Sequence, residues 1–218
     1  MPTISYKLSN GQRIQGTTTK ISDNLGWNKK PLQHWAWKQG MDGKNYWETT
    51  QKAADAGTIA HYLIECDLRK LKPDLKQYKG MPDLVEMAVF AFEQSYLPWK
   101  NMVKFKALEM EIHLVSELYE YGATPDCIAS VNDRLALFDW KTSGGVYPEM
   151  VIQMAAYKNA WDETHPTTPI TDGAYMLRIN KETAAFHFHH WLDLSKPWEA
   201  FLCLLKLSNL KDELKRMV

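Results

Sequence analysis

Two acidic residues and one lysine near the middle of the chain have the types and spacing needed for metal-dependent chemistry. Asp126 begins one predicted strand, Asp139 lies near the end of the next, and a tight turn at Asn132-Asp133 separates the two strands. A short antiparallel hairpin brings its open ends side by side, so we expect the two carboxylates to converge. Converging carboxylates repel each other unless a cation neutralises both, and hard oxygen ligands favour Mg²⁺ or Mn²⁺. The hairpin therefore predicts a divalent metal site.

Lys141 follows Asp139 by two residues, and in a strand this spacing puts both side chains on the same face. Its ammonium group can then orient a metal-bound water, hold it as hydroxide, or stabilise negative charge during cleavage of a phosphodiester. An ordinary surface hairpin with an Asp–Lys ion pair explains the same three residues. Both interpretations remain open on these residues alone.

Two further residues are candidate metal ligands. His61 lies inside a predicted helix and shares a face with Glu65, and a neutral imidazole can bind a metal ion. Glu111 lies on the strand before the hairpin and is a candidate acidic group near the metal. The alternatives are a core histidine beside a surface glutamate, and a solvated strand face.

Gln153 and Tyr157 share one face of the helix predicted directly after Lys141. Because that helix begins close to the end of the strand, Gln153 can hydrogen-bond Lys141 or a phosphate, and Tyr157 can contact a DNA backbone. The polar edge of an amphipathic helix is the alternative explanation.

Hydrophobic periodicity predicts the elements that must bring these residues together. The predicted helices cover 32–37 (ended by Gly40), 49–71, 82–96 (with Pro98 beyond its end), 147–161, and 195 to the C-terminus with Ser195 as its cap. The predicted strands cover 105–115, 126–131, 134–141, 173–179 and 184–191, the last two around Asn180-Lys181. This order indicates an α/β (α+β) fold with a mixed central β-sheet flanked by helices on both faces.

The composition is that of an ordinary globular domain. The 218 residues suit a single domain, and no repeat or linker divides them. The 26 basic and 26 acidic residues argue against a purely electrostatic nucleic-acid binder, but they allow a local basic surface beside a local acidic pocket. No apolar run approaches membrane-spanning length and the N-terminus lacks an apolar signal segment, so we expect a soluble, cytoplasmic protein.

The three cysteines, Cys66, Cys127 and Cys203, lie far apart and form no C-x-x-C pair. Disulfides, a zinc ribbon and a local iron–sulfur signature are therefore unsupported. We expect free buried thiols in a reducing cytosol.

Five segments, taken in order, resemble the PD-(D/E)xK nuclease superfamily. The likeness is greatest to the RecB-like exonuclease branch, which includes phage exonucleases and the mitochondrial genome maintenance exonuclease. The segments are Leu32-Gln33-His34-Trp35 before Gly40, Ala53-Ala54-Asp55-Ala56-Gly57-Thr58-Ile59-Ala60-His61, Glu111 followed by Tyr121-Gly122-Ala123-Thr124-Pro125-Asp126, Asp139-Trp140-Lys141-Thr142-Ser143, and Gln153-Met154-Ala155-Ala156-Tyr157. The resemblance implies one nuclease domain over 1–218 with a restriction-endonuclease-like core, in which 1–47 is an N-terminal extension packing near the active site.

The same resemblance implies a role for each matching residue, with Mg²⁺ or Mn²⁺ as the cofactor. It departs from the family pattern at Thr124, where a glycine is usual two residues before the motif aspartate; this alters the entry to the strand but removes no catalytic side chain. The implied roles are metal ligation by His61, Asp126 and Asp139, catalysis by Lys141, and support of the site or contact with DNA by Gln153 and Tyr157.

The expected activity is that of a metal-dependent DNA exonuclease, phage- or RecB-like, acting on DNA with a free end in recombination, repair or replication. A sequence-tolerant endonuclease and a non-catalytic DNA-binding module on the same fold are the alternatives. The presence of Asp126, Asp139 and Lys141 together argues against the non-catalytic module.

A free-end requirement would need a physical basis. We expect the 1–47 segment, with Trp27, Trp35 and Trp37, and the 82–97 helix to roof the site into a passage that admits a strand end and stacks its bases. Packing in the core is the competing explanation for any single tryptophan among the nine.

Overall fold

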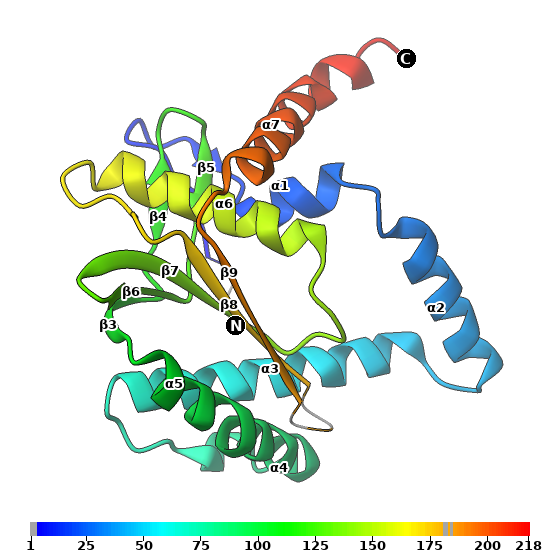
Figure 1. The fold of residues 1–218 in the computed structure, drawn as a ribbon. Helices are drawn as coiled ribbons and strands as arrows, with labels where there is room; N and C mark the ends of the chain where they lie inside the picture. The colour runs from blue at the N-terminus through cyan, green and yellow to red at the C-terminus, as the bar shows by residue number, and fades with distance from the viewer. Residues whose placement is uncertain (1–3, 181–182, 184) are drawn as a thin grey trace.

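A five-stranded mixed β-sheet, in the order β3-β6-β7-β8-β9, forms the centre of the protein (Figure 1). The computed structural model describes residues 4–180, 183 and 185–218. β7 and β8 run parallel, and the other neighbouring strands run antiparallel. The strands are β3 (Lys106–Met110), β6 (Cys127–Val131), β7 (Arg134–Lys141), β8 (Ala174–Ile179) and β9 (Phe186–Trp191). The predicted α/β class with a mixed central sheet is confirmed.

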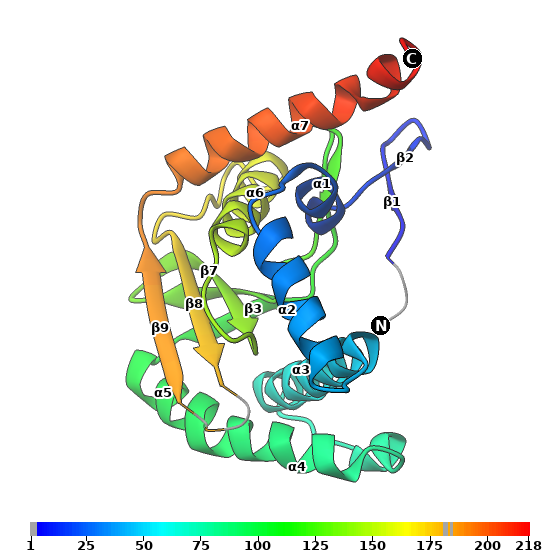
Figure 2. The ribbon, with the colours of Figure 1, turned by 90° about the vertical axis from the view of Figure 1, so that its right-hand side faces the viewer.

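Helices cover both faces of this sheet (Figures 1 and 2). On one face lies α6 (Pro148–Thr164), which connects the parallel strands β7 and β8, as a parallel pair requires. α1 (Thr17–Asn24) and α7 (Ser195–Lys215) pack against α6. On the other face lie α3 (Tyr46–Leu68) and α5 (Leu97–Val103), and α4 (Pro82–Ala91) packs against α3.

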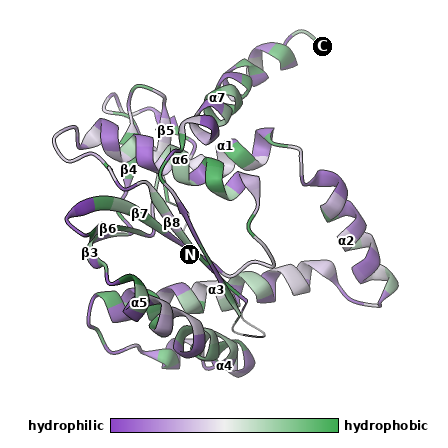
Figure 3. Cartoon of the chain, viewed as in Figure 1, coloured by the Kyte–Doolittle hydropathy of each residue, from purple (hydrophilic) through white to green (hydrophobic). Residues whose placement is uncertain are grey.

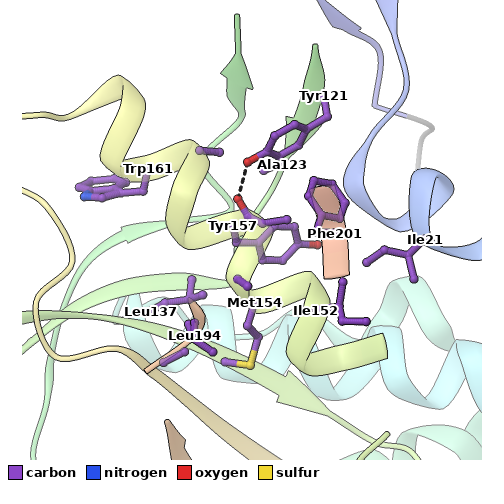
Figure 4. Close-up of a cluster of buried hydrophobic side chains, with 14 of the residues drawn as sticks. Ile21, Tyr121, Ala123, Leu137, Ile152, Met154, Tyr157, Trp161, Leu194 and Phe201 are labelled. Atoms are coloured by element: carbon purple, nitrogen blue, oxygen red, sulfur yellow. Dashed lines mark hydrogen bonds between the residues drawn. The ribbon is translucent and has the colours of Figure 1, made fainter. Parts of the chain in front are cut away.

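Alternation along β7 divides the core between these two faces. Leu137 joins the core under α6, with Met154 and Phe201 (Figure 4), whereas Phe138 joins the core that contains Trp99 on the other face. Figure 3 shows β6 and β7 as mainly hydrophobic, as expected for strands covered on both sides. Because side chains alternate, Asp139 and Lys141 share the face of Leu137 and point toward α6.

The hairpin of β6 and β7 forms as predicted. Cys127 pairs with Phe138, and the strands meet at a two-residue turn. Asn132 and Asp133 have φ angles of 49° and 63°, which are the left-handed values that a type I′ turn requires.

The predicted strand 105–115 is wrong as a single element. It is broken by Glu111, whose φ of 53° turns the chain between β3 and a separate strand, β4 (Leu114–Ser116). β4 pairs with β5 (Tyr121–Ala123) in a small second sheet. The sequence did not predict β5, the α1 helix, or the N-terminal hairpin of β1 (Tyr6–Lys7) and β2 (Arg13–Ile14). These elements are too short to carry a periodic signal.

The prediction that a helix ends before Pro98 is also wrong. The helix continues from α4 through a π-helical segment, η2 (Phe92–Tyr96), into α5, and Pro98 lies in the first turn of α5. The predicted 49–71 helix is α3, and a short 3₁₀ turn, η1 (Leu75–Tyr78), follows it.

Two other helix boundaries differ from the prediction. α2 (Lys29–Met41) is longer than the predicted 32–37 helix and runs past Gly40. Ser195 is the first residue of α7 rather than its cap, and its backbone N–H donates a 2.8 Å hydrogen bond to Oδ1 of Asp193. Lys181 was predicted to lie in a turn and Ala184 to begin the last strand, and both lie outside the described residues.

Cys66 and Cys127 are buried free thiols, as expected, but Cys203 is free and exposed on α7. None of the helices in the described part of the chain is both long enough and apolar enough to cross a membrane.

Candidate active site

The end of β7 presents an ion pair that is held by α6. Nζ of Lys141 lies 2.8 Å from Oδ2 of Asp139, and it donates a 3.0 Å hydrogen bond to Oε1 of Gln153 on α6. Only 1% of the Asp139 side chain is exposed, whereas 21% of the Lys141 side chain is. Lys141 is therefore fixed by partners on two elements, β7 and α6.

Asp126 lies opposite Asp139, directly before β6, because the pairing of Cys127 with Phe138 brings the two aspartates to the same end of the hairpin. Oδ2 of Asp126 accepts a 2.8 Å hydrogen bond from the backbone N–H of Trp140. This bond ties the open end of the hairpin together and fixes the Asp126 carboxylate.

Glu111 reaches the same place through the break in its strand. Its backbone N–H donates a 3.2 Å hydrogen bond to the carbonyl oxygen of Asp126, and its left-handed φ turns the chain at this point. A left-handed non-glycine residue stores backbone strain that the surrounding structure must hold, and such residues cluster at functional sites. The strain thus accompanies the placement of a third acidic group.

His61 approaches these acids from α3. Its Nδ1 lies 3.7 Å from Oδ2 of Asp126. The helix can come this close because Gly57 faces the end of β7, where a Cβ atom would lie 2.8 Å from Oγ1 of Thr142. Close packing of α3 on the end of β7 therefore explains why residue 57, one turn before His61, is a glycine.

These side chains form a group that fits a hard divalent cation. One potential ligand atom from each of His61, Glu111 and Asp126 lies within 4.8 Å of the others. Next to them, Oδ2 of Asp139 is buried and accepts no hydrogen bond within the described residues, although it pairs with Lys141 by charge. Carboxylate oxygens with at most one imidazole suit Mg²⁺ or Mn²⁺.

The pKa values of the same groups reflect crowding of negative charge. Burial, followed by the charges of Asp126 and Glu65, raises the pKa of Glu111 to about 7. Burial also raises the pKa of Asp139, with Lys141 opposing the rise. A bound cation would offset these penalties, because it favours the ionised form of each carboxyl group.

Lys141 has the opposite balance. Burial alone would lower the pKa of its ammonium group, but the carboxylates of Asp139 and Asp126 outweigh burial and raise the pKa above its usual value. The side chain is therefore a protonated donor at neutral pH, suited to stabilising negative charge rather than to accepting a proton.

α6 and α1 complete the support of Lys141. Nε2 of Gln153 donates hydrogen bonds to the hydroxyl of Tyr157, at 2.7 Å, and to Oγ1 of Thr18 on α1, at 2.9 Å. Tyr157 is buried, and burial raises its pKa well above the usual value. Its hydroxyl is thus a neutral structural partner of Gln153, and of its two anticipated roles the structure favours support of the site over contact with DNA.

Two hollows flank the site. One, of about 360 Å³, is lined by His61 and Glu111 together with Tyr62, Tyr78 and His113. The other, of about 340 Å³, lies beyond Gln153, between α1, α2 and α6.

All seven residues predicted for the site therefore lie in one region, but several of their partners were not predicted from the sequence. Thr18, which comes from the N-terminal extension, contacts Gln153, which lies 135 residues later in the chain. No local sequence pattern predicts such a contact. Glu65, four residues after His61, pairs with Arg69 at 2.7 Å rather than joining the group of potential metal ligands. The expectation that the 82–97 helix roofs the site is wrong, because α4 packs on α3 away from the β7 end (Figure 2).

Comparisons with known proteins add little. No protein-family model and no curated protein matches the chain. Among solved structures, the crystal structure of SSO0001 is 14% identical, with a TM-score of 0.34 over 64% of this chain and 68% of that one. A likeness this weak carries no argument about fold or function.

Proposed function

We propose that this protein is a metal-dependent deoxyribonuclease of the PD-(D/E)xK type that hydrolyses phosphodiester bonds. The observation that carries the proposal is a protonated lysine, held by Asp139 and Gln153, beside an acidic group formed by Glu111 and Asp126. Metal ligands next to a fixed cation are what hydrolysis of an anionic, unreactive ester requires. The sequence resemblance to RecB-like exonucleases supports the same assignment.

Each residue has a role that follows from its contacts. His61, Glu111, Asp126 and Asp139 would hold Mg²⁺ or Mn²⁺. When bound, the ion would polarise the phosphate and activate water. Lys141, which donates hydrogen bonds to Asp139 and Gln153, would stabilise the negative charge that develops on phosphate oxygens. Gln153 positions Lys141, and Thr18 and Tyr157 position Gln153.

The proposal is tested by digestion of end-labelled linear DNA, single- and double-stranded, with Mg²⁺ or with EDTA. We expect Asp139→Asn and Lys141→Met each to lower cleavage by about 10²- to 10³-fold without loss of the folded state. Lys158→Met is the matched control, because Lys158 is a similarly exposed lysine that pairs with an aspartate, Asp162, on α6. Near-normal cleavage by folded Lys141→Met would refute the site.

Circular DNA separates the two modes of cleavage. An exonuclease leaves covalently closed or single-stranded circles intact while it degrades linear DNA of the same strandedness. Equal rates on circles and linear molecules would replace the exonuclease proposal with an endonuclease.

A further inference from the structure

Residues 26–54, called here the aromatic arm, form a part of the fold that has almost no packing of its own. The arm consists of α2, the corner after it and the first turns of α3. It therefore connects the end of α1 to the remainder of α3 (Figures 1 and 2). α2 contains no buried residue. A helix of 13 residues is marginal in water without packing, so contacts with a ligand would stabilise it.

Exposed tryptophans are concentrated on this arm. Trp35 exposes 36% of its surface, and Trp27, Trp37 and Trp47 expose 61–69%. Among the described residues no other tryptophan reaches this degree of exposure, so packing in the core, the alternative weighed from the sequence, fails for these four. Tyr46 lies between two of them, with ring centroids 4.6 Å from Trp47 and 6.4 Å from Trp35.

The arm is also basic although the whole chain is neutral. It carries five lysines (Lys29, Lys30, Lys38, Lys44 and Lys52) but only two acidic residues, Asp42 and Glu48. The rest of the chain therefore has a net negative charge. Lysines interleaved with exposed rings match the two needs of a single strand, neutralised phosphates and faces on which bases stack.

The arrangement of the rings favours a nucleic-acid strand over a protein helix. Trp35 and Trp37 are two residues apart in α2, so they point to different sides of the helix. A docking protein helix would need a single apolar stripe at spacings of three and four residues. A flexible strand that wraps the arm can use rings on several sides, and a duplex cannot, because its base faces are already stacked.

The arm is continuous with the candidate site at both ends. Asn28, Lys29 and Leu32 line the hollow that Gln153 borders, and Nδ2 of Asn28 donates a 3.1 Å hydrogen bond to Oε1 of Glu149 on α6. At its other end the arm continues along α3 to His61. Each end of the arm therefore leads toward the candidate site, one through the hollow beside Gln153 and the other along α3.

We propose that the aromatic arm binds single-stranded DNA, by stacking bases on Trp37, Trp47 and their neighbouring rings, and delivers it to the site. This inference rests on the proposed nuclease function for its substrate and gives that function a preference for unpaired strands.

The test measures binding in EDTA, where no cleavage occurs, by fluorescence anisotropy of a labelled thymidine 20-mer and of a blunt hairpin duplex of equal length. We expect tighter binding of the single strand. Trp37→Ala and Trp47→Ala should each raise its Kd about tenfold and leave the duplex Kd unchanged. Trp37→Phe, which keeps a ring, should retain most of the affinity. Leu118→Ala removes an equally exposed apolar side chain outside the arm and should change nothing.

The arm lysines provide a second measurement. Lys38→Gln and Lys44→Gln should each reduce the slope of log Kd against log salt by roughly 0.7 for the single strand. Because these side chains are exposed, all variants should keep the wild-type melting temperature within about 2 °C.

Unchanged single-strand affinity in the Trp37→Ala/Trp47→Ala double variant would overturn the inference, as would equal losses for single strand and duplex. A change of oligomeric state without a change in DNA binding would instead identify the arm as a contact between two copies, and would also overturn it. Nuclease activity that depends on Lys141 survives any of these outcomes. Conversely, Trp-dependent binding without cleavage would support the arm and refute the nuclease.

Discussion

Replacement of Glu111 by glutamine should have opposite effects on stability with and without metal. In the metal-free protein, burial and the neighbouring carboxylates raise the pKa of Glu111 from 4.5 to about 7. The folded state therefore penalises the ionised carboxyl: the penalty is absent below pH 4.5, grows as the pH rises, and is complete above about pH 7. Glu111→Gln removes this penalty, so it should stabilise the metal-free protein at pH 8.

The size of the effect follows from the same shift. For a fully buried carboxyl it would correspond to about 3 kcal/mol, and partial exposure of Glu111 to solvent reduces it to about 1–2 kcal/mol. In a chain of this length that is a rise in Tm of roughly 3–6 °C. With Mg²⁺ at 100 times its Kd, the wild type should gain about 2.7 kcal/mol, and the variant should gain much less because it has lost a ligand.

The assay is thermal unfolding of wild type and Glu111→Gln, in EDTA and in Mg²⁺, at pH 8 and pH 5. Glu109→Gln is the matched control, since Glu109 is an exposed glutamate on β3 outside the acidic group, and it should behave as wild type. Destabilisation by Glu111→Gln in EDTA at pH 8 would refute the reasoning about charge. A wild-type Tm that does not respond to Mg²⁺ or Mn²⁺ would refute the metal site.

Three further outcomes are expected. His61→Ala should raise the Mg²⁺ concentration needed for activity about tenfold or more, while DNA affinity in EDTA stays unchanged. His113→Ala, in the same hollow, is the control. An equal loss of DNA binding in His61→Ala would count against a ligand role. Ca²⁺ should support DNA binding but poor cleavage, because its looser coordination positions and acidifies water less well, so full activity with Ca²⁺ would be inconsistent with the site. Gly122→Ala should destabilise the protein by about 1–3 kcal/mol in urea unfolding, since its Cβ would lie 2.0 Å from the Tyr6 ring. Tyr6→Ala in the same background should restore part of the lost stability. If neither change has an effect, the N-terminal hairpin is not packed against Gly122.

The hairpin of the candidate site was predictable because its signals are local. Asn132-Asp133 identifies the turn, alternation identifies β6 and β7, and the two-residue spacing puts Asp139 and Lys141 on one face. The central sheet followed from the same periodicity.

The remaining parts of the site depend on contacts that sequence periodicity does not encode. The apolar alternation of 105–115 gave no sign that Glu111 is left-handed, and the hydrogen bond of its backbone N–H to the carbonyl oxygen of Asp126 joins segments that are far apart in the sequence. Thr18 and Gln153 meet only when α1 packs on α6. The exposure of Trp37 and Trp47 could not be predicted either, since the same residue type is buried at Trp99.

The π-helical segment between α4 and α5 makes this part of the chain sensitive to a change in length. Ala88 and Ala91, which precede this segment, are fully buried. Tyr96, its last residue, and Trp99, in the following helix α5, are fully buried as well. In an α-helix each residue turns the chain by about 100°, and a π-helical turn accommodates one additional residue. Deletion of a single residue within Phe92–Tyr96 would restore regular α-helix and rotate Trp99 away from the sheet. Natural relatives of this chain should therefore vary in residue type at these positions far more readily than in residue number.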